Sequence, residues 1–175
     1  MSQNCVDLAS YIRDIDDWPK PGIIYKDITP LLADAAAFSC AVRKMADNFR
    51  DAGIDYVAAV DARGFIFGAA VAIELGIGFV PVRKKGKLPS KTESATYDLE
   101  YGTDCLEIHI DAVKKGSKVL MVDDLLATGG TMAAACELIE KIGGSIEAVM
   151  FLIELKFLNG SDKLKGYKVS SLIEY

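Results

Sequence analysis

Residues 119–131 of the chain read Val119-Leu120-Met121-Val122-Asp123-Asp124-Leu125-Leu126-Ala127-Thr128-Gly129-Gly130-Thr131. The first residues form a short apolar run, which is typical of a strand covered on both faces of a parallel sheet. A loop with two carboxylates and two glycines follows, and a helix is predicted from about Thr131 to Ile142. A strand over 118–122, a loop over 123–130 and this helix make one βα unit, so the pattern predicts an α/β protein.

A second βα unit lies upstream. It has a predicted strand over 56–60, a turn over 61–64 and a helix of small residues over 65–75. Before it, Asp34 is placed to cap a helix that Gly53 ends. The apolar residues of that helix lie at helical spacing, at Phe38, Ala41, Val42, Met45, Ala46 and Phe49. With further strands predicted over 79–82, 146–153 and 168–173, the fold class is α/β, with an open, mainly parallel twisted sheet flanked by helices.

Two irregular segments lie between these units. Residues 83–89 combine basic side chains with Gly86 and Pro89, which predicts a mobile loop without regular structure. Residues 94–109 suggest two ragged strands around a turn at 101–104. We therefore expect a flexible hairpin that projects from the main sheet.

Length and composition exclude several classes of protein. The chain has 175 residues and no repeat or linker, which predicts a single domain over 1–175. Its net charge of -5 makes nucleic acid an unfavourable partner. No stretch resembles a membrane helix of about 20 residues or a signal peptide, so we expect a cytoplasmic protein with no membrane partner. The apolar share of 51% favours a homodimer that buries the surplus.

The cysteines and the histidine exclude structural zinc. The four cysteines lie far apart without a Cys-x-x-Cys pair, and His109 is the one histidine of the sequence. We expect the thiols to be ordinary reduced side chains.

Ligands of open parallel sheets bind beyond the carboxyl ends of the strands, so the loops over 61–64, 83–93 and 123–131 should share one rim. Residues 127–131 combine glycines, threonine hydroxyls and a helix start, which together suit a terminal phosphate. Asp123 and Asp124 suit vicinal sugar hydroxyls or a hydrated Mg²⁺. Taken singly, these features could be a helix cap and a solvated strand end. Together they indicate a phosphorylated ribose as the ligand.

Other nucleotide-binding motifs are absent from the sequence. It contains no Gly-x-x-x-x-Gly-Lys-[Ser/Thr] loop, and Gly76-Ile77-Gly78 lacks a third glycine and precedes a predicted strand. Neither a nucleoside triphosphate loop nor a dinucleotide-binding fingerprint is therefore expected.

Residues 119–131 resemble the 5-phosphoribosyl pyrophosphate (PRPP) motif of type I phosphoribosyltransferases, and the rest of the chain is similar to the adenine-specific members. The supporting blocks are Pro21-Gly22-Ile23-Ile24-Tyr25-Lys26-Asp27-Ile28-Thr29-Pro30, Asp61-Ala62-Arg63-Gly64-Phe65, Arg83-Lys84-Lys85-Gly86-Lys87-Leu88-Pro89 and Tyr97-Asp98-Leu99-Glu100-Tyr101-Gly102. The resemblance covers essentially all 175 residues. It implies the family's fold, with a small hood formed by about 1–33 and 155–165.

The resemblance implies transfer of the 5-phosphoribosyl group of PRPP to N9 of adenine, with AMP and pyrophosphate as products. Asp123 and Asp124 would bind the ribose hydroxyls. The 5'-phosphate would be bound by Ala127, Thr128, Gly129, Gly130 and Thr131, and the pyrophosphate by Asp61, Ala62, Arg63, Arg83 and Lys87. Mg²⁺ would be held mainly by the substrate, without a certain protein ligand.

Two features of the pyrophosphate residues follow from the same resemblance. The Asp61–Ala62 peptide bond is expected to be cis. Ala62 replaces the usual serine of the family, so a hydroxyl contact is lost there. Lys87 would act in its own site or in that of the neighbouring subunit.

Glu100 and Arg63 are the implied catalytic residues, with Glu100 transferring a proton near N7 of adenine. Ile24 and Lys26 would contact the adenine edge through their main chains. Tyr25 would stack on the base in place of the more familiar phenylalanine, and Leu158 would close the other face. Ordinary surface exposure for Glu100 and ordinary hood packing for Tyr25 and Leu158 are the alternatives.

Two other functions are considered. Transfer to another purine base is disfavoured by Ala127, because hypoxanthine-guanine enzymes carry an aspartate there. A non-catalytic PRPP-sensing regulator is disfavoured because Arg63, Lys87 and Glu100 are all retained. The segment 75–92 contains five basic and no acidic side chains, so the acidic chain carries a local cationic lid where pyrophosphate should leave.

Overall fold

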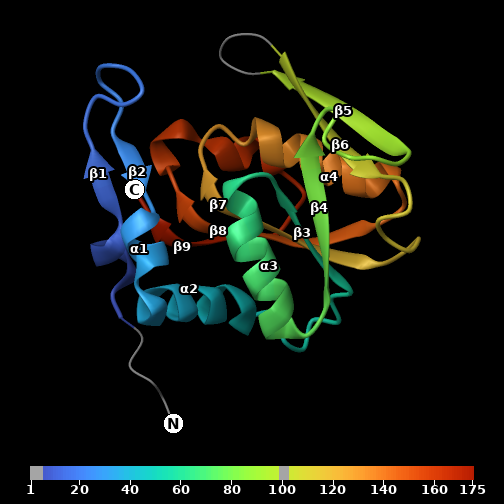
Figure 1. Cartoon of the computed structure of the whole chain (residues 1–175), viewed down its shortest axis with the longest axis horizontal. Helices are drawn as coiled ribbons and strands as arrows, with labels where there is room; N and C mark the ends of the chain where they lie inside the picture. Colours follow the sequence, from blue (N-terminus) through green and yellow to red (C-terminus); the bar gives the residue numbers. More distant parts are fainter. Residues whose placement is uncertain (1–5, 99–102) are drawn as a thin grey trace.

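The structure, a computed structural model, describes residues 6–98 and 103–175, in which seven strands form the main sheet in the order β5-β6-β4-β3-β7-β8-β9 (Figure 1). The strands are β3 (Tyr56–Val60), β4 (Gly78–Lys84), β5 (Thr92–Asp98), β6 (Thr103–His109), β7 (Lys118–Leu126), β8 (Ser145–Glu154) and β9 (Val169–Glu174). The strands from β4 to β9 along this order are parallel, whereas β5 and β6 form an antiparallel hairpin at one edge. The structure thus confirms an α/β fold with an open, mainly parallel sheet.

Helices cover both faces of this sheet (Figure 1). Helices α2 (Ala35–Asp47) and α3 (Arg63–Leu75) pack with Val57 and Leu120, whereas α4 (Gly130–Lys141) packs with Ala58 and Met121. Neighbouring residues of β3 and β7 contact opposite layers because successive side chains of a strand point to opposite faces. Two apolar layers explain why these strands are nearly continuous apolar runs in the sequence.

Strand β7 is longer than predicted. We expected it to end at Val122, but it continues to Leu126, and α4 begins at Gly130, so the connecting loop is only 127–129. Strand β8 pairs with this extension, with Asp123 opposite Phe151 and Leu125 opposite Ile153. This pairing outweighs the low strand propensity of aspartate.

Helix α2 begins as predicted. The Asp34 side chain accepts hydrogen bonds from the Ala36 and Ala37 amides at 3.0 and 2.8 Å, which caps the first turn. The predicted end at Gly53 is wrong, because the helix ends at Asp47, before the last residue of its apolar stripe, Phe49.

The predicted loop over 83–89 begins later than expected. Arg83 and Lys84 belong to β4, because Glu107 and Leu106 of β6 pair with them. The segment is anchored further by the Gly86 amide, which donates to the Glu107 carboxylate at 2.9 Å. The predicted hairpin is confirmed as β5 and β6, although β5 already begins at Thr92. Of the turn predicted over 101–104, Thr103 and Asp104 instead belong to β6, and residues 101 and 102 lie outside the described residues.

The hood segments contain short elements that the sequence did not predict. They are β1 (Arg13–Ile15) paired with β2 (Tyr25–Asp27), α1 (Thr29–Ala33) and the 3-10 turns at Leu8–Tyr11, Lys156–Leu158 and Gly160–Leu164. Strands of three residues are too short to show a periodic pattern. Figure 1 shows β1 and β2 beside the carboxyl-terminal end of the chain, and the Lys26 ammonium lies 3.7 Å from the centre of the Tyr175 ring.

Within 6–98 and 103–175, no helix combines the length and apolar composition needed to cross a membrane. Cys105 and Cys136 are free thiols, and burial raises the pKa of Cys136 to about 12. Cys40 of α2 is disulfide-bonded, so the expectation of reduced thiols is wrong for this residue. Spacing along a chain carries little information about which thiols meet in space.

Candidate active site

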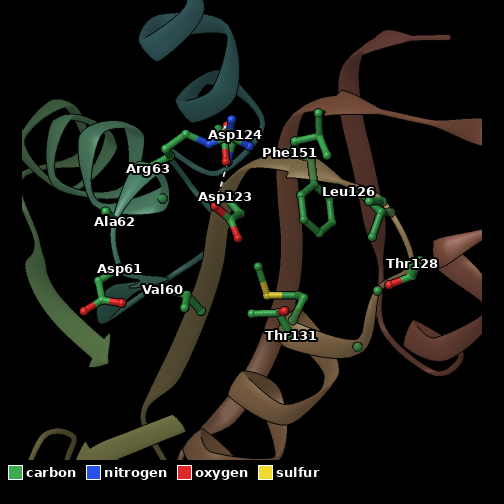
Figure 2. Close-up of a pocket in the computed structure, with 16 residues that line it drawn as sticks. Val60, Asp61, Ala62, Arg63, Asp123, Asp124, Leu126, Thr128, Thr131 and Phe151 are labelled. Carbon is green, nitrogen blue, oxygen red and sulfur yellow. Dashed lines mark hydrogen bonds and ion pairs between the residues drawn. The ribbon is translucent and has the colours of Figure 1, made fainter. Parts of the chain in front are cut away.

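A cavity of about 240 Å³ opens at the carboxyl ends of β3 and β7 (Figure 2). Its lining comes from residues 60–64 and 123–132, with Phe151 from β8. Strand β3 connects through α3 to β4 on one side, whereas β7 lies on its other side. The cavity therefore lies where the direction of the connections reverses, which is the usual ligand position in such sheets.

The three predicted rim loops do not contribute equally. Residues 61–64 and 123–131 line the cavity together, as expected. The described segment 83–93 supplies no lining residue, and it is linked to the cavity through an ion pair of 3.1 Å between Arg83 Nε and Asp61 Oδ2. The longer β4 explains the difference, because strand pairing with β6 holds the segment at the sheet edge.

Asp123 and Asp124 lie within β7, so their side chains point in different directions. Figure 2 shows the Asp123 carboxylate directed into the cavity and the Asp124 carboxylate directed toward Arg63. Asp123 Oδ1 also accepts a hydrogen bond of 2.9 Å from the Asp124 amide. The sheet thus places two carboxylates at one edge of the cavity.

The surroundings of both carboxylates disfavour their charged forms. Burial raises the pKa of Asp123 well above its ordinary value, and the negative charge of Asp124 adds to the effect. Burial also raises the pKa of Asp124, while the positive charge of Arg63 opposes this rise. Arg63 Nε lies 2.9 Å from Asp124 Oδ2, but among the described residues that buried oxygen accepts no well-aligned hydrogen bond. Such oxygens are suited to hydroxyl donors from a ligand.

The loop between β7 and α4 has the form of an anion cradle. Gly129 adopts a φ of +77° at the start of α4, and the free amides of the first helical turn follow it. Thr128 and Thr131 line the same cavity. All five residues of 127–131 are thus brought to the cavity wall, as predicted.

Gly160 is a supporting residue that the sequence analysis missed. A Cβ atom at Gly129 would lie 2.2 Å from the Gly160 oxygen, and a Cβ at Gly160 would lie 2.1 Å from the Ala127 oxygen. The two backbones therefore approach too closely for any side chain. The Asn159-Gly160 pair is a turn signal, but the turn signal says nothing about which loop it contacts.

The pyrophosphate residues are brought together only in part. The Asp61–Ala62 peptide bond is cis, as predicted, and Arg63 begins α3 at the cavity. Arg83 is held between Asp61 and the Lys87 carbonyl, to which Arg83 Nη1 donates at 3.2 Å. The Lys87 side chain is not among the groups that line the cavity.

The residues predicted to bind adenine lie outside the lining of this cavity. Ile24 and Leu158 are exposed, with 53% and 39% of their surface accessible, whereas Lys26 is buried and its ammonium pairs with Asp14 at 2.7 Å. Tyr25 approaches the cavity through its hydroxyl, which accepts a hydrogen bond from Arg63 Nη1. Glu100 lies outside the described residues.

A comparison with protein families identifies the class. Residues 31–172 match the model of the phosphoribosyl transferase domain. The match spans the cavity, the cradle and both carboxylates, and the chain is a member of the phosphoribosyltransferase family.

Individual relatives narrow the family. The adenine phosphoribosyltransferase of Christiangramia forsetii is 57% identical over 97% of this chain and 99% of its own length. A crystal structure of adenine phosphoribosyltransferase from Thermoanaerobacter pseudethanolicus matches with a TM-score of 0.93 at 54% identity, over 96% of this chain and 98% of that chain. The Saccharomyces cerevisiae enzyme, in complex with an imino-altritol bisphosphate and adenine, matches with a TM-score of 0.89 at 39% identity, over 94% and 95% of the two chains. The chain belongs to the adenine phosphoribosyltransferase family.

Proposed function

We propose that this chain is an enzyme of purine salvage that transfers the 5-phosphoribosyl group of PRPP to N9 of adenine, releasing AMP and pyrophosphate. One observation carries the proposal: a desolvated carboxylate pair and a glycine-lined helix start face the same cavity, at the distance of one βα loop. The family membership narrows the phosphorylated ribose to PRPP and the acceptor to adenine.

The ribose 5-phosphate portion of PRPP would occupy the described cavity. Asp123 and Asp124 would accept hydrogen bonds from the two ribose hydroxyls, which supply the donors that these buried oxygens need. The amides and hydroxyls of 127–131 would bind the 5'-phosphate, with the helix dipole of α4 favouring its charge. Rigid binding at both ends would hold C1' in line between the base and the departing pyrophosphate.

The pyrophosphate would bind along the Asp61–Ala62 turn, with Arg63, Arg83 and Lys87 as cations. A departing polyanion needs positive charge as the C1'–O bond breaks, so these cations would act mainly in the transition state. In the structure Arg63 and Arg83 are paired with Asp124 and Asp61, so substrate binding would exchange these partners for phosphate oxygens.

Mg²⁺ is proposed as the cofactor. The described residues hold no group of three or more His, Cys, Asp or Glu side chains placed for a metal. Asp61, Asp123 and Asp124 line the cavity. Such carboxylates fit an ion that arrives with PRPP, because Mg²⁺ keeps several waters and takes one or two carboxylates plus substrate phosphates. When bound, the ion would neutralise charge on the leaving pyrophosphate.

Adenine would bind under the hood. Ile24 and Lys26 would use their main chains to contact the base edge, and the exposed Leu158 would close one face of the base. The Lys26 side chain is already paired with Asp14, so only its main chain is proposed to take part in recognition. Glu100, which lies outside the described residues, is proposed to transfer a proton near N7.

A homodimer in the cytoplasm is also proposed. Ile66 and Ile73, two turns apart on α3, are 39% and 82% exposed, and a second copy could cover them. Such a dimer would let Lys87 serve either its own site or that of its neighbour. The cytoplasm is favoured because PRPP is a polyanion that does not cross a bilayer, so an enzyme that uses PRPP must lie in the compartment where PRPP is made.

A product assay tests the proposed reaction. The protein is incubated with Mg²⁺, PRPP and one purine base at a time, and nucleotides are separated by chromatography. We expect AMP from adenine and at least about 100-fold less nucleotide from hypoxanthine, guanine or xanthine, because a base-edge site rejects mismatched donors strongly. Preferred turnover of another base would identify a different purine specificity. Tight PRPP binding without any nucleotide would favour a PRPP-sensing regulator.

A further inference from the structure

Arg63 contacts both halves of the proposed site. Its Nε lies 2.9 Å from Asp124 Oδ2, and its Nη1 donates a hydrogen bond to the Tyr25 hydroxyl. The guanidinium carbon also lies 5.4 Å from the centre of the Tyr25 ring. One side chain of α3 therefore joins β2 of the hood to the carboxylate pair of β7.

Tyr25 is itself held firmly. The backbone of Tyr25 pairs with that of Ile15 in the two-stranded sheet. Trp18 packs edge-on against the Tyr25 ring, with 4.5 Å between the ring centroids. The hydroxyl is thus a fixed acceptor rather than the end of a free side chain. Arg63, in contrast, has a long side chain that is 37% exposed and has room to change partner.

The position of Arg63 has a consequence for Asp124. The guanidinium covers Oδ2, the buried oxygen that accepts no well-aligned hydrogen bond among the described residues. Because Oδ2 is buried and Arg63 Nε lies 2.9 Å from it, a ribose hydroxyl that donates to this oxygen would compete with Arg63. Displacement costs the ion pair and, at the same time, the hydrogen bond to Tyr25.

We propose that the Tyr25 hydroxyl is a positioning group that holds Arg63 over Asp124 and thereby opposes PRPP binding. The inference rests on the proposed function, since it takes Asp124 as an acceptor for a ribose hydroxyl. It assigns Tyr25 two separate parts: the ring contacts the base, and the hydroxyl sets how easily the guanidinium leaves the carboxylate.

The Tyr25→Phe variant tests this assignment because it removes only the hydroxyl. PRPP affinity is measured by calorimetry with the full chain and Mg²⁺, and the KM for adenine is measured separately. We expect the variant to bind PRPP about three- to tenfold more tightly, which is the range of an ordinary net hydrogen bond, because water can solvate the partly exposed guanidinium. The KM for adenine should stay within about twofold, because the ring is retained. Tyr56→Phe, at the amino end of β3, is the matched control and should change neither quantity.

A double-mutant cycle separates a positioning role from a general structural one. In an Arg63→Ala background, Tyr25→Phe should leave PRPP affinity unchanged, since the group on which the hydroxyl acts is gone. Weaker or unchanged PRPP binding in Tyr25→Phe would overturn the proposal, and so would a tightening of equal size in the Arg63→Ala background. A wild-type chain that binds PRPP but forms no AMP would overturn the proposed reaction alone, because the binding cycle would still report on Tyr25.

Discussion

The two ends of the proposed PRPP site differ in how the fold positions them. The carboxylates and the phosphate cradle belong to β7 and to the start of α4, where strand pairing and close backbone contacts fix them. Arg63 and Arg83, the cations proposed for the pyrophosphate, are long side chains at element ends, and each is paired with a carboxylate, Asp124 or Asp61. One end is positioned by backbone and the other by exchangeable ion pairs.

This difference indicates how the site divides its tasks. An end fixed by the backbone would hold ribose 5-phosphate with little rearrangement, which is the requirement for keeping C1' in line. At the end built from side chains, the arginines are paired with carboxylates of the protein, and a more highly charged anion would replace these carboxylates as their partner. Substitutions at the first end should therefore cost more activity than substitutions at the second.

The largest effect is expected for Gly129→Ala. The new Cβ would lie 2.2 Å from the Gly160 oxygen, and alanine is strained at the φ of +77°. The loop would have to move by about 1 Å, a displacement that commonly costs about 100-fold in rate, and kcat/KM should fall at least that far. Steady-state kinetics measure the loss, and thermal unfolding should show a lower Tm. Gly53→Ala, with a similar φ of +66° and open space around it, is the control and should lower the Tm without this loss of activity.

Asp123→Asn separates activity from stability. The amide keeps the shape but cannot accept hydroxyl hydrogens with both of its polar atoms, so kcat/KM should fall about 10- to 100-fold. The same change removes a buried charge next to Asp124, so the Tm at pH 7 should rise by about 2 °C or more. Kinetics and calorimetry on one preparation test the predicted fall in kcat/KM and the predicted rise in Tm. A lower Tm would contradict the electrostatic description of the pair.

The pH dependence of stability follows from the same residue. A carboxyl whose pKa is raised by folding binds its proton more tightly in the folded state, so its contribution to stability falls as pH rises from its ordinary value of 3.8 toward the raised pKa. The Tm advantage of Asp123→Asn over wild type should therefore grow as the pH rises above about 4. Thermal unfolding at several pH values measures it, and a constant advantage would mean that the pKa of Asp123 is not raised.

Arg83→Gln should have an intermediate effect. It removes one cation and the contacts with Asp61 and the Lys87 carbonyl, but it leaves the backbone of the cradle unchanged. We expect a loss of about tenfold in kcat/KM for PRPP and a KM for adenine within about twofold of wild type. Varying PRPP and adenine separately distinguishes these effects, and an equal rise of both KM values would place Arg83 in the general fold rather than at the pyrophosphate.

The smallest effect is expected for Lys85→Ala. Lys85 is an exposed residue just beyond the last residue of β4, and its backbone amide bonds to the Cys105 carbonyl, so alanine preserves the backbone contact. The rate should stay within about twofold of wild type, as for most exposed charges. A loss as large as that of Arg83→Gln would show that the whole basic segment acts as one anion site.

The sequence predicts one end of the site better than the other. The strand, the paired carboxylates and the glycine turn are local patterns, so residues 119–131 could be assigned before any coordinates. The continuation of β7 to Leu126 and of β4 to Lys84 depends on neighbouring strands, which a local pattern does not contain. The contact of Gly160 with the cradle and the contact of Arg63 with Tyr25 join residues 31 and 38 positions apart in the chain, and neither has a signal of its own.

The most direct test of the proposed reaction is to measure its stoichiometry in wild type and in Asp123→Asn. Adenine, AMP and pyrophosphate are quantified in one time course for each protein. We predict one AMP and one pyrophosphate for each adenine consumed, and the same ratio at a rate about 10- to 100-fold lower in the variant. Pyrophosphate release without consumption of adenine, or an unchanged rate in Asp123→Asn, would contradict the proposal that this carboxylate pair holds PRPP for transfer to the base.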